Sequence, residues 1–213
     1  MGNPYWPLAG LRLSTSRLVL RPCTEADLPA LADAVPGDAE ADPALPVHGV
    51  ADPRLARGIA LHQSYWQAMG GWSAASWRLP FVVLLGGRAV GVQELEADGF
   101  ARRRVVATAS WLVPGVRRTG VGTEMRAAVL HLAFGGLDAL VAETEAWWDN
   151  AGSLGVSRTL GYEPNGETVH VHGDRRDRMV RMRLTAERWR AVGPSHPATV
   201  EGLEECRHLF GAG

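Results

Sequence analysis

Apolar and polar residues alternate over several short stretches of the chain, while elsewhere apolar residues recur three and four positions apart. The first pattern is typical of strands and the second of helices that bury one face. Alternating or short apolar stretches predict strands over residues 17–22, 79–85, 88–96, 104–113, 139–144, 167–173 and 178–184. Helical spacing and cap residues predict helices that begin at residues 24 and 185, and helices over 53–69, 120–134 and 150–160.

Turn and cap residues mark the boundaries of these elements. Thr24 before acidic residues, and Asp52 before Pro53, are typical of helix starts. The two glycines at 86–87 separate two strands and predict a hairpin. Residues 36–51 are rich in proline, glycine, alanine and aspartate, which predicts a loop.

The order of strand, two helices, three strands, helix, strand, helix and two strands favours the α/β (α+β) class. A mixed sheet with helices on both faces fits this order. We expect one domain over residues 11–192, with residues 1–10 and 193–213 as peripheral termini. Apolar residues at helical spacing in the second helix predict its buried face: Leu55, Ile59, Trp66 and Met69.

Length and charge narrow the class of protein. A chain of 213 residues, 46% of them hydrophobic, supports one ordinary globular domain. Its formal net charge of −1 argues against a dedicated nucleic-acid binder, which usually carries a basic excess. No apolar run approaches the roughly 20 residues that span a bilayer, and residues 1–10 lack the pattern of a secretory signal. We therefore expect a cytoplasmic protein with no nucleic-acid or membrane partner.

All 22 basic residues are arginine, because the chain contains no lysine. This excludes a Walker P-loop, which requires lysine after glycine. It also excludes Schiff-base and pyridoxal-phosphate mechanisms in this chain. The two cysteines, Cys23 and Cys206, lack metal-ligand spacing. His170 and His172 share one strand face without a visible third ligand, so no metal is expected.

Residues 117–123 lie between a predicted strand end and a predicted helix start. Gly120 and Gly122 let a ligand approach the backbone closely, because no Cβ intervenes. The helix N-terminus behind them offers unpaired N–H groups and a partial positive charge, which suit a pyrophosphate. Arg117 and Arg118 add further donors. The same glycines also fit a plain turn into a core helix.

The strand, the pattern Arg-x-x-Gly-x-Gly at 117–122 and the amphipathic helix together resemble the acyl-CoA motif of the GNAT superfamily of N-acyltransferases. Residues 13–21 are similar to the opening strand of its RimJ/RimL-like branch. Asn150 and Ser153, with residues 160–162 after them, resemble that branch's Asn-x-x-Ser and Leu-Gly-Tyr segments. These blocks cover most of residues 11–184. Residues 123–130 also resemble a bacterial subgroup described as succinyl-CoA transferases.

The resemblance implies a GNAT fold, whose mostly antiparallel mixed sheet splays apart at the acyl-CoA site. It implies that the third strand of the central group pairs with the pantetheine arm through Trp111, Leu112 and Val113. The pyrophosphate would lie on the N–H groups of Gly120, Val121, Gly122 and Thr123, near Arg117 and Arg118. Asn150 would contact pantetheine or support the second splayed strand, and Ser153 would contact CoA.

The expected reaction is attack of an amine on a thioester, for which the amine must lose a proton. Glu94 is the candidate base, with Glu96 on the same strand face in reserve. Glu94 also fits a strand-end carboxylate in solvent. The oxyanion would be held by the N–H of Leu112 or Val113. Ser157 stands where many GNAT enzymes carry a tyrosine acid, so either Ser153 protonates the thiolate or the thiolate leaves unassisted.

These features predict an N-acyltransferase that moves an acetyl group, or a longer or acidic acyl group such as succinyl, from CoA to a primary amine. The acceptor is a small-molecule amine or a protein N-terminus, and a homodimer is the default expectation for the branch. A catalytically inactive acyl-CoA-binding module and a nucleotide-binding regulator are the alternatives. Three tryptophans suit either an aromatic acceptor pocket or core packing: Trp66, Trp72 and Trp77.

Overall fold

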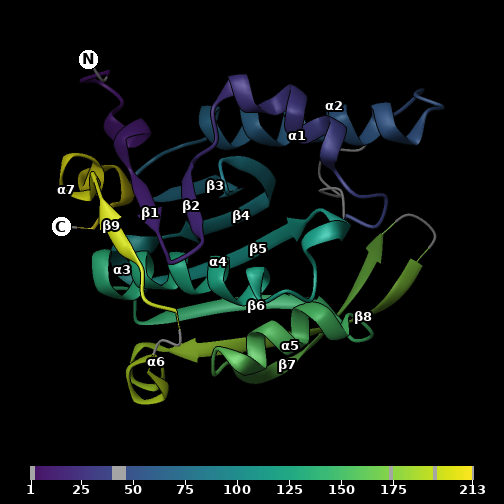
Figure 1. Ribbon diagram of the computed structural model, residues 1–213. Coiled ribbons are helices and arrows are strands. Elements are labelled where there is room, and N and C mark those ends of the chain that lie inside the picture. Colours follow the sequence, from purple (N-terminus) through teal and green to yellow (C-terminus); the bar gives the residue numbers. More distant parts are fainter. Residues whose placement is uncertain (1–2, 40–46, 173–174, 194–195, 213) are drawn as a thin grey trace.

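The computed structural model describes residues 3–39, 47–172, 175–193 and 196–212. Its strands form one nine-stranded sheet in the order β7-β8-β6-β5-β4-β3-β2-β1-β9. Figure 1 shows this sheet as the centre of the molecule. The strands are β1 (Arg12–Ser14), β2 (Leu18–Pro22), β3 (Ser76–Leu85), β4 (Arg88–Asp98), β5 (Val105–Leu112), β6 (Val141–Trp147), β7 (Glu163–His172), β8 (Arg175–Thr185) and β9 (Thr199–Glu201).

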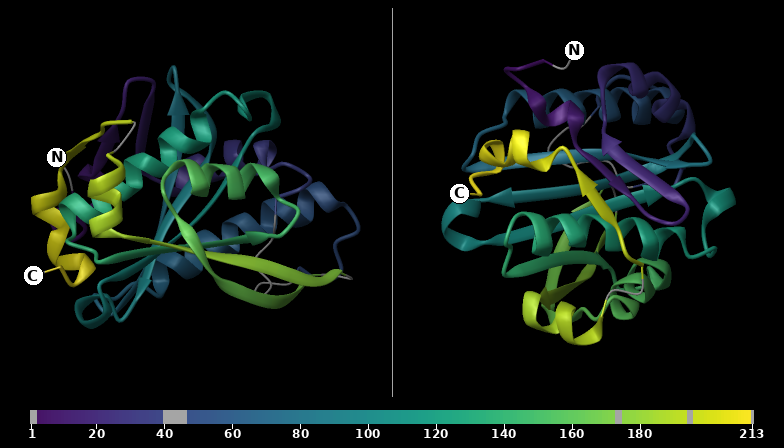
Figure 2. Two further views of the ribbon diagram at one scale, coloured as in Figure 1. Left: turned by 90° about the horizontal axis from the view of Figure 1, so that it is seen from below. Right: turned by 60° about the vertical axis from the view of Figure 1, so that its left-hand side comes forward.

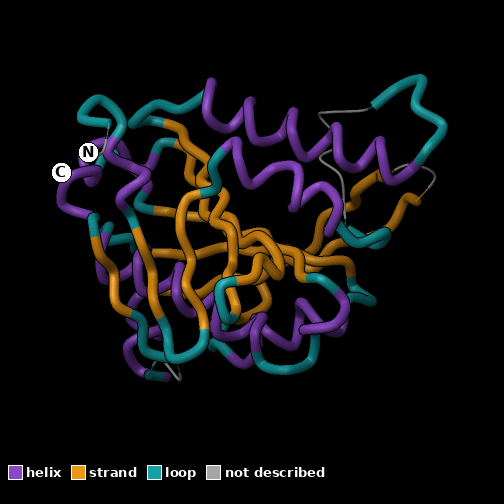
Figure 3. Tube along the Cα trace, turned by 45° about the horizontal axis from the view of Figure 1, so that its top comes forward, coloured by secondary structure: helices purple, strands orange, loops and turns teal. Residues whose placement is uncertain are grey.

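Helices cover both faces of the sheet, as predicted. Leu28 and Leu31 of α1 pack with Val82 and Val92 on one face, where α1 and α2 run side by side (Figures 1 and 3). A larger core on the other face includes the buried residues of α4. The helices are α1 (Leu28–Ala34), α2 (Pro53–Gly70), α3 (Phe100–Arg103), α4 (Val121–Leu130), α5 (Ala151–Thr159), α6 (Ala186–Val192) and α7 (Leu203–Cys206). None of the described helices is long and apolar enough to span a membrane.

Local signals produce most of these boundaries. The Asp52 side chain accepts a hydrogen bond from Arg54 N–H at 2.8 Å and caps α2, with Pro53 at the first helical position. The glycines at 86–87 both have positive φ and close the β3–β4 hairpin. The predicted helix over 120–134 is α4, which continues as a π-helical turn from His131 to Gly136. These sequence predictions are confirmed.

The sheet opens between β5 and β6, its only parallel pair among the described strands. The two strands pair only from Val105 to Ala107, opposite residues 141–143. Beyond these rungs β5 runs on to Leu112 and β6 to Trp147, without pairing to each other. The sheet is therefore mixed, mostly antiparallel and splayed at this point, as the resemblance implied. We call the gap beyond the last rung the opening.

The prediction that residues 193–213 are peripheral is wrong. β9 pairs with β1 and extends the sheet by one strand. Phe210 and Cys206 are fully buried, and Trp77 Nε1 donates to the Phe210 carbonyl oxygen at 3.1 Å. Figure 2 shows this C-terminal segment in yellow alongside the N-terminal segment. Its elements have only three or four residues each, so no local pattern indicated that the segment would pair with β1 and pack against Trp77.

The expected buried face of α2 is also wrong in part. Leu55 and Trp66 are 55% and 50% exposed, whereas Ala60 and Ala68 are buried. A Cβ added at Gly58 would lie 3.3 Å from the Cβ of Ala32, so α1 and α2 pack through small residues. Close helix approach therefore selects alanine and glycine for the contact and turns the large residues outward.

Asp27 joins the end of β2 to the start of α1. Arg21 donates to both of its carboxylate oxygens, at 2.7 and 2.6 Å, and Thr24 N–H donates at 2.8 Å. The hydrogen bonds from Arg21 are the main reason why the pKa of Asp27 falls to about 2. The ordinary aspartate pKa is about 3.9. Because the folded value is the lower one, Asp27 stabilises the fold above about pH 4, and this stability disappears as the pH falls toward 2.

Asp27→Asn is accordingly expected to lower the free energy of unfolding by about 2 kcal/mol at pH 7. It should also flatten the loss of stability between about pH 5 and pH 2. Urea unfolding at a series of pH values measures both effects. Asp33→Asn, which alters an exposed pair with Arg54, is the control and should change stability by less than about 0.5 kcal/mol. Equal pH profiles for wild type and Asp27→Asn would contradict this account.

Candidate active site

The opening begins just beyond the last backbone pairing between β5 and β6. At this point a side chain, that of Thr144, connects the two strands. Thr144 Oγ1 donates to the Thr108 carbonyl oxygen at 3.0 Å, just beyond the last backbone rung. The next two residues of β5, Ala109 and Ser110, are exposed although they lie in a central strand. Beyond this point β5 and β6 no longer pair with each other.

Every second residue of β5 directs its backbone groups toward the opening. Val113 N–H donates to the Val90 carbonyl oxygen at 2.9 Å, so the odd-numbered residues of β5 direct their backbone groups to β4. Ser110 and Leu112 direct theirs to the opposite edge, toward the opening. Of the three residues predicted to pair with pantetheine, only Leu112 presents its N–H there. Trp111 and Val113 use theirs in the ladder with β4, and Ser110 is the donor that the sequence did not indicate.

The glycine-rich segment lies at the mouth of the opening. Gly120 is the exposed N-cap of α4 with a φ of 84°, and Val121 begins the helix. Gly122 and Thr123 are half-buried in its first turn. The N–H groups of this turn have no helical acceptor, and they carry the positive end of the helix dipole. This geometry suits an anion.

A buried carboxylate fixes that segment to the β1–β2 turn. Glu124 is fully buried and accepts hydrogen bonds from Thr15 Oγ1 at 2.6 Å and from Arg17 Nε at 2.7 Å. Arg17 Nη1 also donates to the Thr119 carbonyl oxygen at 3.1 Å. Burial by itself raises the pKa of Glu124, but the hydrogen bonds from Thr15 and Arg17 together hold it below its ordinary value. Glu124 is therefore ionised at neutral pH and anchors the loop.

The two arginines of the motif differ in their surroundings. Arg117 donates from Nε to the Leu112 carbonyl oxygen at 2.9 Å and from Nη1 to Asp38 Oδ2 at 2.6 Å. Its guanidinium is thus committed to the protein, which suits a role in shaping the loop better than the predicted contact with phosphate. Arg118 is exposed beside Gly120 and has a positive φ of 61°. Its side chain is the one that extends toward solvent at the predicted phosphate site.

Asn150 and Ser153 lie at the start of α5. The Asn150 side chain accepts from Ser153 N–H at 3.0 Å, so this asparagine caps the helix. Ser153 is half-buried, and its carbonyl oxygen accepts from Ser157 Oγ at 3.0 Å. Ser157 is buried and also accepts from Arg126 Nη1 at 2.8 Å. Sequence reasoning missed Arg126, because an arginine within an amphipathic helix usually lies on its polar face.

Carboxylates flank the opening on the face of the sheet that α2 covers. Glu94 and Glu96 of β4 pair with Ala109 and Ala107 of β5, and Ala107 pairs in turn with Glu143 of β6. Side chains of paired strand residues share one face, so these three glutamates surround two alanines at the start of the opening. The small alanine side chains leave room above the strand, and the sequence did not reveal that Glu143 would join the set.

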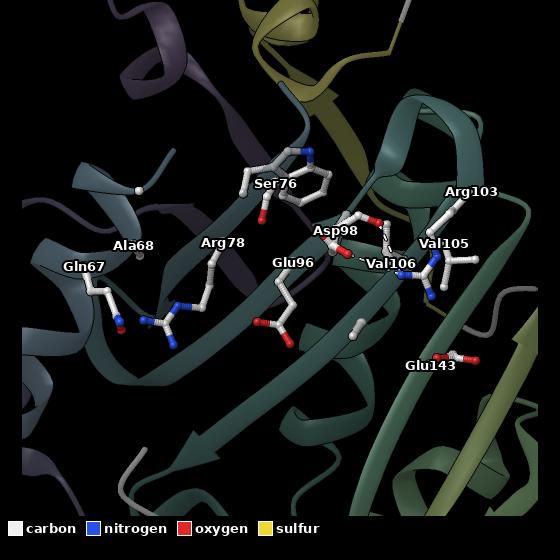
Figure 4. A pocket seen from close by; sticks show the side chains of 14 residues that line it. Gln67, Ala68, Ser76, Arg78, Glu96, Asp98, Arg103, Val105, Val106 and Glu143 are labelled. Carbon is white, nitrogen blue, oxygen red and sulfur yellow. Dashed lines mark hydrogen bonds and ion pairs between the residues drawn. The ribbon is translucent and has the colours of Figure 1, made fainter. Parts of the chain in front are cut away.

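A cavity of about 440 Å³ lies at this place, between the end of α2 and the sheet. Glu96 and Glu143 line it from two strands, and Figure 4 shows Glu96 pointing into it beside Arg78. Asp98 also lines it and forms an ion pair with Arg103 at 3.5 Å. Glu94 lies two residues along β4 from Glu96, on the side of the opening, and lines a small crevice under α1 and α2.

The tryptophans expected near an acceptor divide between two roles. Trp77 is 3% exposed, packs against Phe210 and Phe100, and lines the cavity with one edge. Trp72 Nε1 donates to the Leu209 carbonyl oxygen at 3.0 Å. Trp66 lies on the outer side of α2 beside His62. Packing of the C-terminal segment is therefore the main use of these rings.

The described strands form a mixed sheet that opens between its two parallel strands, and the glycine-rich N-terminus of α4 lies at the mouth of this opening. Residues 17–163 match the family described as Acetyltransferase (GNAT) domain. The chain belongs to this family and is an N-acetyltransferase by class.

Solved structures share the fold at low sequence identity. Mycobacterium smegmatis RimJ in complex with CoA-disulfide is 18% identical with a TM-score of 0.63, covering 92% of this chain and 98% of that one. A GCN5-related N-acetyltransferase from Brucella melitensis is 18% identical with a TM-score of 0.64, covering 85% and 81%. A chimera of the spermidine N-acetyltransferase SpeG from Vibrio cholerae and hSSAT is 15% identical with a TM-score of 0.63, covering 82% and 98%.

Proposed function

We propose that this protein transfers an acyl group from acyl-CoA to a primary amine by direct attack in a ternary complex. The observation that supports this proposal is that the opening lies between the N-terminus of α4 and the cavity under α2. The glycine-rich N-terminus of α4 lies at its mouth, and the glutamate-lined cavity lies on the face that α2 covers. A donor held along β5 and an amine in the cavity would meet at the opening.

The donor site would use the groups that face the opening. Pyrophosphate would bind the N–H groups of Gly120, Val121, Gly122 and Thr123, with Arg118 beside them. Pantetheine would pair with the backbone of Ser110 and Leu112, which have the alternation that an added strand needs. The N–H of Leu112 is then the candidate for the oxyanion, because that of Val113 already donates to β4.

The acceptor is best described as a cationic amine, either a small molecule or a protein N-terminus. Glu94, Glu96 and Glu143 would attract an ammonium group, which must then lose a proton before it attacks. We assign Glu94 as the proton acceptor because its rung partner, Ala109, is the first alanine beyond the last β5–β6 rung. Glu96 would hold the charge of the acceptor in the cavity, together with Glu143, which also forms an ion pair with Arg181 at 3.8 Å.

The reaction balances without a metal or an added redox partner. Glu94 accepts a proton from the ammonium, directly or through water, and the amine nitrogen attacks the thioester carbonyl carbon. The carbon–sulfur bond breaks and the nitrogen gives up its second proton, which reaches the thiolate through water or through Ser153, whose hydroxyl gives one proton to the sulfur and takes one back in the same relay. The RimJ and SpeG likenesses are consistent with a RimJ/RimL-type enzyme that acts on a protein N-terminus or a polyamine, and the carboxylates favour a cationic acceptor in either case.

A thermal-shift panel with acetyl-CoA, free CoA, ATP and NAD tests the donor site. A ligand at a hundredfold excess over its Kd adds about 2.7 kcal/mol, which corresponds to roughly 5–10 °C for a domain of this size. Only the CoA species should give this shift. A shift with ATP or NAD instead would favour a nucleotide-binding regulator.

Gly120→Ala is expected to raise the Kd for CoA at least tenfold. A Cβ at this positive φ is strained by roughly 1–2 kcal/mol, and it would lie 3.3 Å from Arg17 Nη2, at the predicted pyrophosphate site. Gly70→Ala is the matched control, because nothing lies within 4 Å of its added Cβ. Calorimetric titration with CoA measures both variants. Wild-type affinity in Gly120→Ala would remove the pyrophosphate from this helix N-terminus.

Thiol release with a panel of amines then separates an enzyme from an inactive binding module. Free thiol should appear only when both an acyl-CoA and a cationic amine are present. Tight CoA binding without thiol release on any diamine, polyamine or peptide N-terminus would favour the binding module.

A further inference from the structure

A guanidinium lies buried between α4, α5 and β5, and among the described residues no carboxylate forms an ion pair with it. Arg126 of α4 is 3% exposed. Its Nη1 donates to Ser157 Oγ at 2.8 Å, and its Nη2 reaches Ser110 Oγ only at 3.4 Å. Its Nε is buried and has no hydrogen-bond partner in the described part of the chain. Burial lowers the pKa of Arg126, and the group that acts most against this is the Tyr162 phenol, not an acid.

Such a charge is costly to bury unless an anion accompanies it. The half-buried Arg21, by contrast, pairs with the Asp27 carboxylate at 2.6 Å. A water molecule would satisfy the Nε of Arg126 but would not neutralise its charge. Arginine also keeps its proton in proteins, so it does not escape the cost by becoming neutral. An anionic ligand beside Arg126 would both neutralise its charge and accept a hydrogen bond from its Nε.

The surroundings of Arg126 connect it to the donor side of the opening. Ser110 is exposed on the part of β5 beyond the last rung, and its backbone faces the opening. Two more buried hydroxyls lie together in the same region, Thr108 Oγ1 and Tyr162 Oη, and their interaction acts against the rise that burial causes in the pKa of Tyr162. The acyl end of a donor that lies along β5 would come next to this polar group.

The free donors of Arg126 have the shape of a carboxylate site. Nη1 is committed to Ser157, whereas Nε and the weakly bonded Nη2 form one edge of the guanidinium. Two parallel N–H donors match the two oxygens of a carboxylate. A thiolate offers a single sulfur atom and would leave one of these donors unpaired.

We propose that Arg126 binds a terminal carboxylate on the acyl group of the donor, so that the protein prefers dicarboxylic acyl-CoA donors, such as malonyl-, succinyl- or glutaryl-CoA, over acetyl-CoA. This inference rests on the proposed function, because it takes the opening as the donor site. It adds a cation at the acyl end, which the sequence alone did not place. Ser110 and Ser157 then position the guanidinium.

Binding of succinyl-CoA and butyryl-CoA provides the test, because the two acyl groups have the same chain length and differ in the terminal charge. Calorimetric titration needs no acceptor amine. We expect wild type to bind succinyl-CoA at least tenfold more tightly than butyryl-CoA. Arg126→Met should bring this ratio close to one. Arg126→Lys keeps the charge but loses the two parallel N–H donors, so its ratio should lie between those of wild type and Arg126→Met. Arg158→Met, which alters an exposed arginine of α5, is the control and should keep the wild-type ratio.

Urea unfolding of the same variants supplies a second measurement. Replacing an unpaired buried charge by methionine of similar length should leave the unfolding midpoint equal or higher, whereas a guanidinium that only supports the fold would lower it. A wild-type ratio near one overturns the proposal, as does a ratio that Arg126→Met leaves unchanged. If no CoA species binds at all, the proposed function itself fails. Binding of CoA and butyryl-CoA without a charge preference refutes only the role of Arg126.

Discussion

Glu94→Gln is expected to lower kcat for amine acylation by roughly 10²–10⁴-fold, the usual contribution of a general base. Glutamine keeps the size of the side chain and its place opposite Ala109, but it cannot accept the ammonium proton. The Kd for the donor should be close to the wild-type value, because the predicted donor contacts lie on β5 and α4. Steady-state kinetics over a range of pH, with one cationic acceptor, measures this effect.

Glu96→Gln is the matched comparison, since it removes the next carboxylate on the same strand face. Glu96 lines the large cavity, so we expect this change mainly to raise the KM for the acceptor. A full wild-type rate in Glu94→Gln at every pH would show that Glu94 is not the base. If the loss of kcat appeared in Glu96→Gln instead, the proton acceptor would be Glu96.

Glu124→Ala is expected to lower the free energy of unfolding by about 3 kcal/mol. Removing one partner of a buried ion pair typically costs about 3–5 kcal/mol, and the lower end applies because the Arg17 side chain is 42% exposed and can turn to water. Thr15, Ser16 and Arg17 would lose their common acceptor at the same time. Urea unfolding measures the change.

The same variant should also bind CoA more weakly, because Arg17 holds the Thr119 carbonyl oxygen next to Gly120. Arg54→Ala, which removes an exposed pair with Asp33, is the control and should change stability by less than about 0.5 kcal/mol. A Glu124→Ala protein of wild-type stability would mean that packing alone, without this ion pair, holds the loop in place.

The sequence indicated the donor side of the site better than the acceptor side. Gly120 and Gly122 stand beside a helix start, so the turn and the exposed N-terminus follow from neighbouring residues alone. Glu94, Glu96 and Glu143 meet only because β5 lies between β4 and β6. No spacing within the sequence brings Glu143 to that face, and none indicated a cavity under the end of α2.

Arginines show the same limit most clearly. Arg117 and Arg118 are neighbours in the motif, and the sequence analysis predicted that both would add donors near the phosphates. In the fold, Arg117 turns to Asp38 and the Leu112 carbonyl oxygen, while Arg118 remains exposed. Arg126 lies within the segment 123–130 that carried one of the resemblances, but nothing in the sequence indicated that its side chain would be buried. The sequence shows which residues are arginines, but the residue that each arginine contacts depends on how the chain packs.

By itself, therefore, the sequence determined what depends on a few consecutive residues: the Asp52 cap of α2, the glycine hairpin at 86–87 and the turn into α4. These features depend on contacts within one or two turns of chain. Only the tertiary structure decided the place of Phe210 in the core, the pairing of Arg17 with Glu124 and the burial of Arg126. Such contacts join residues far apart in the chain, and their energies depend on burial and distance, which no local pattern specifies.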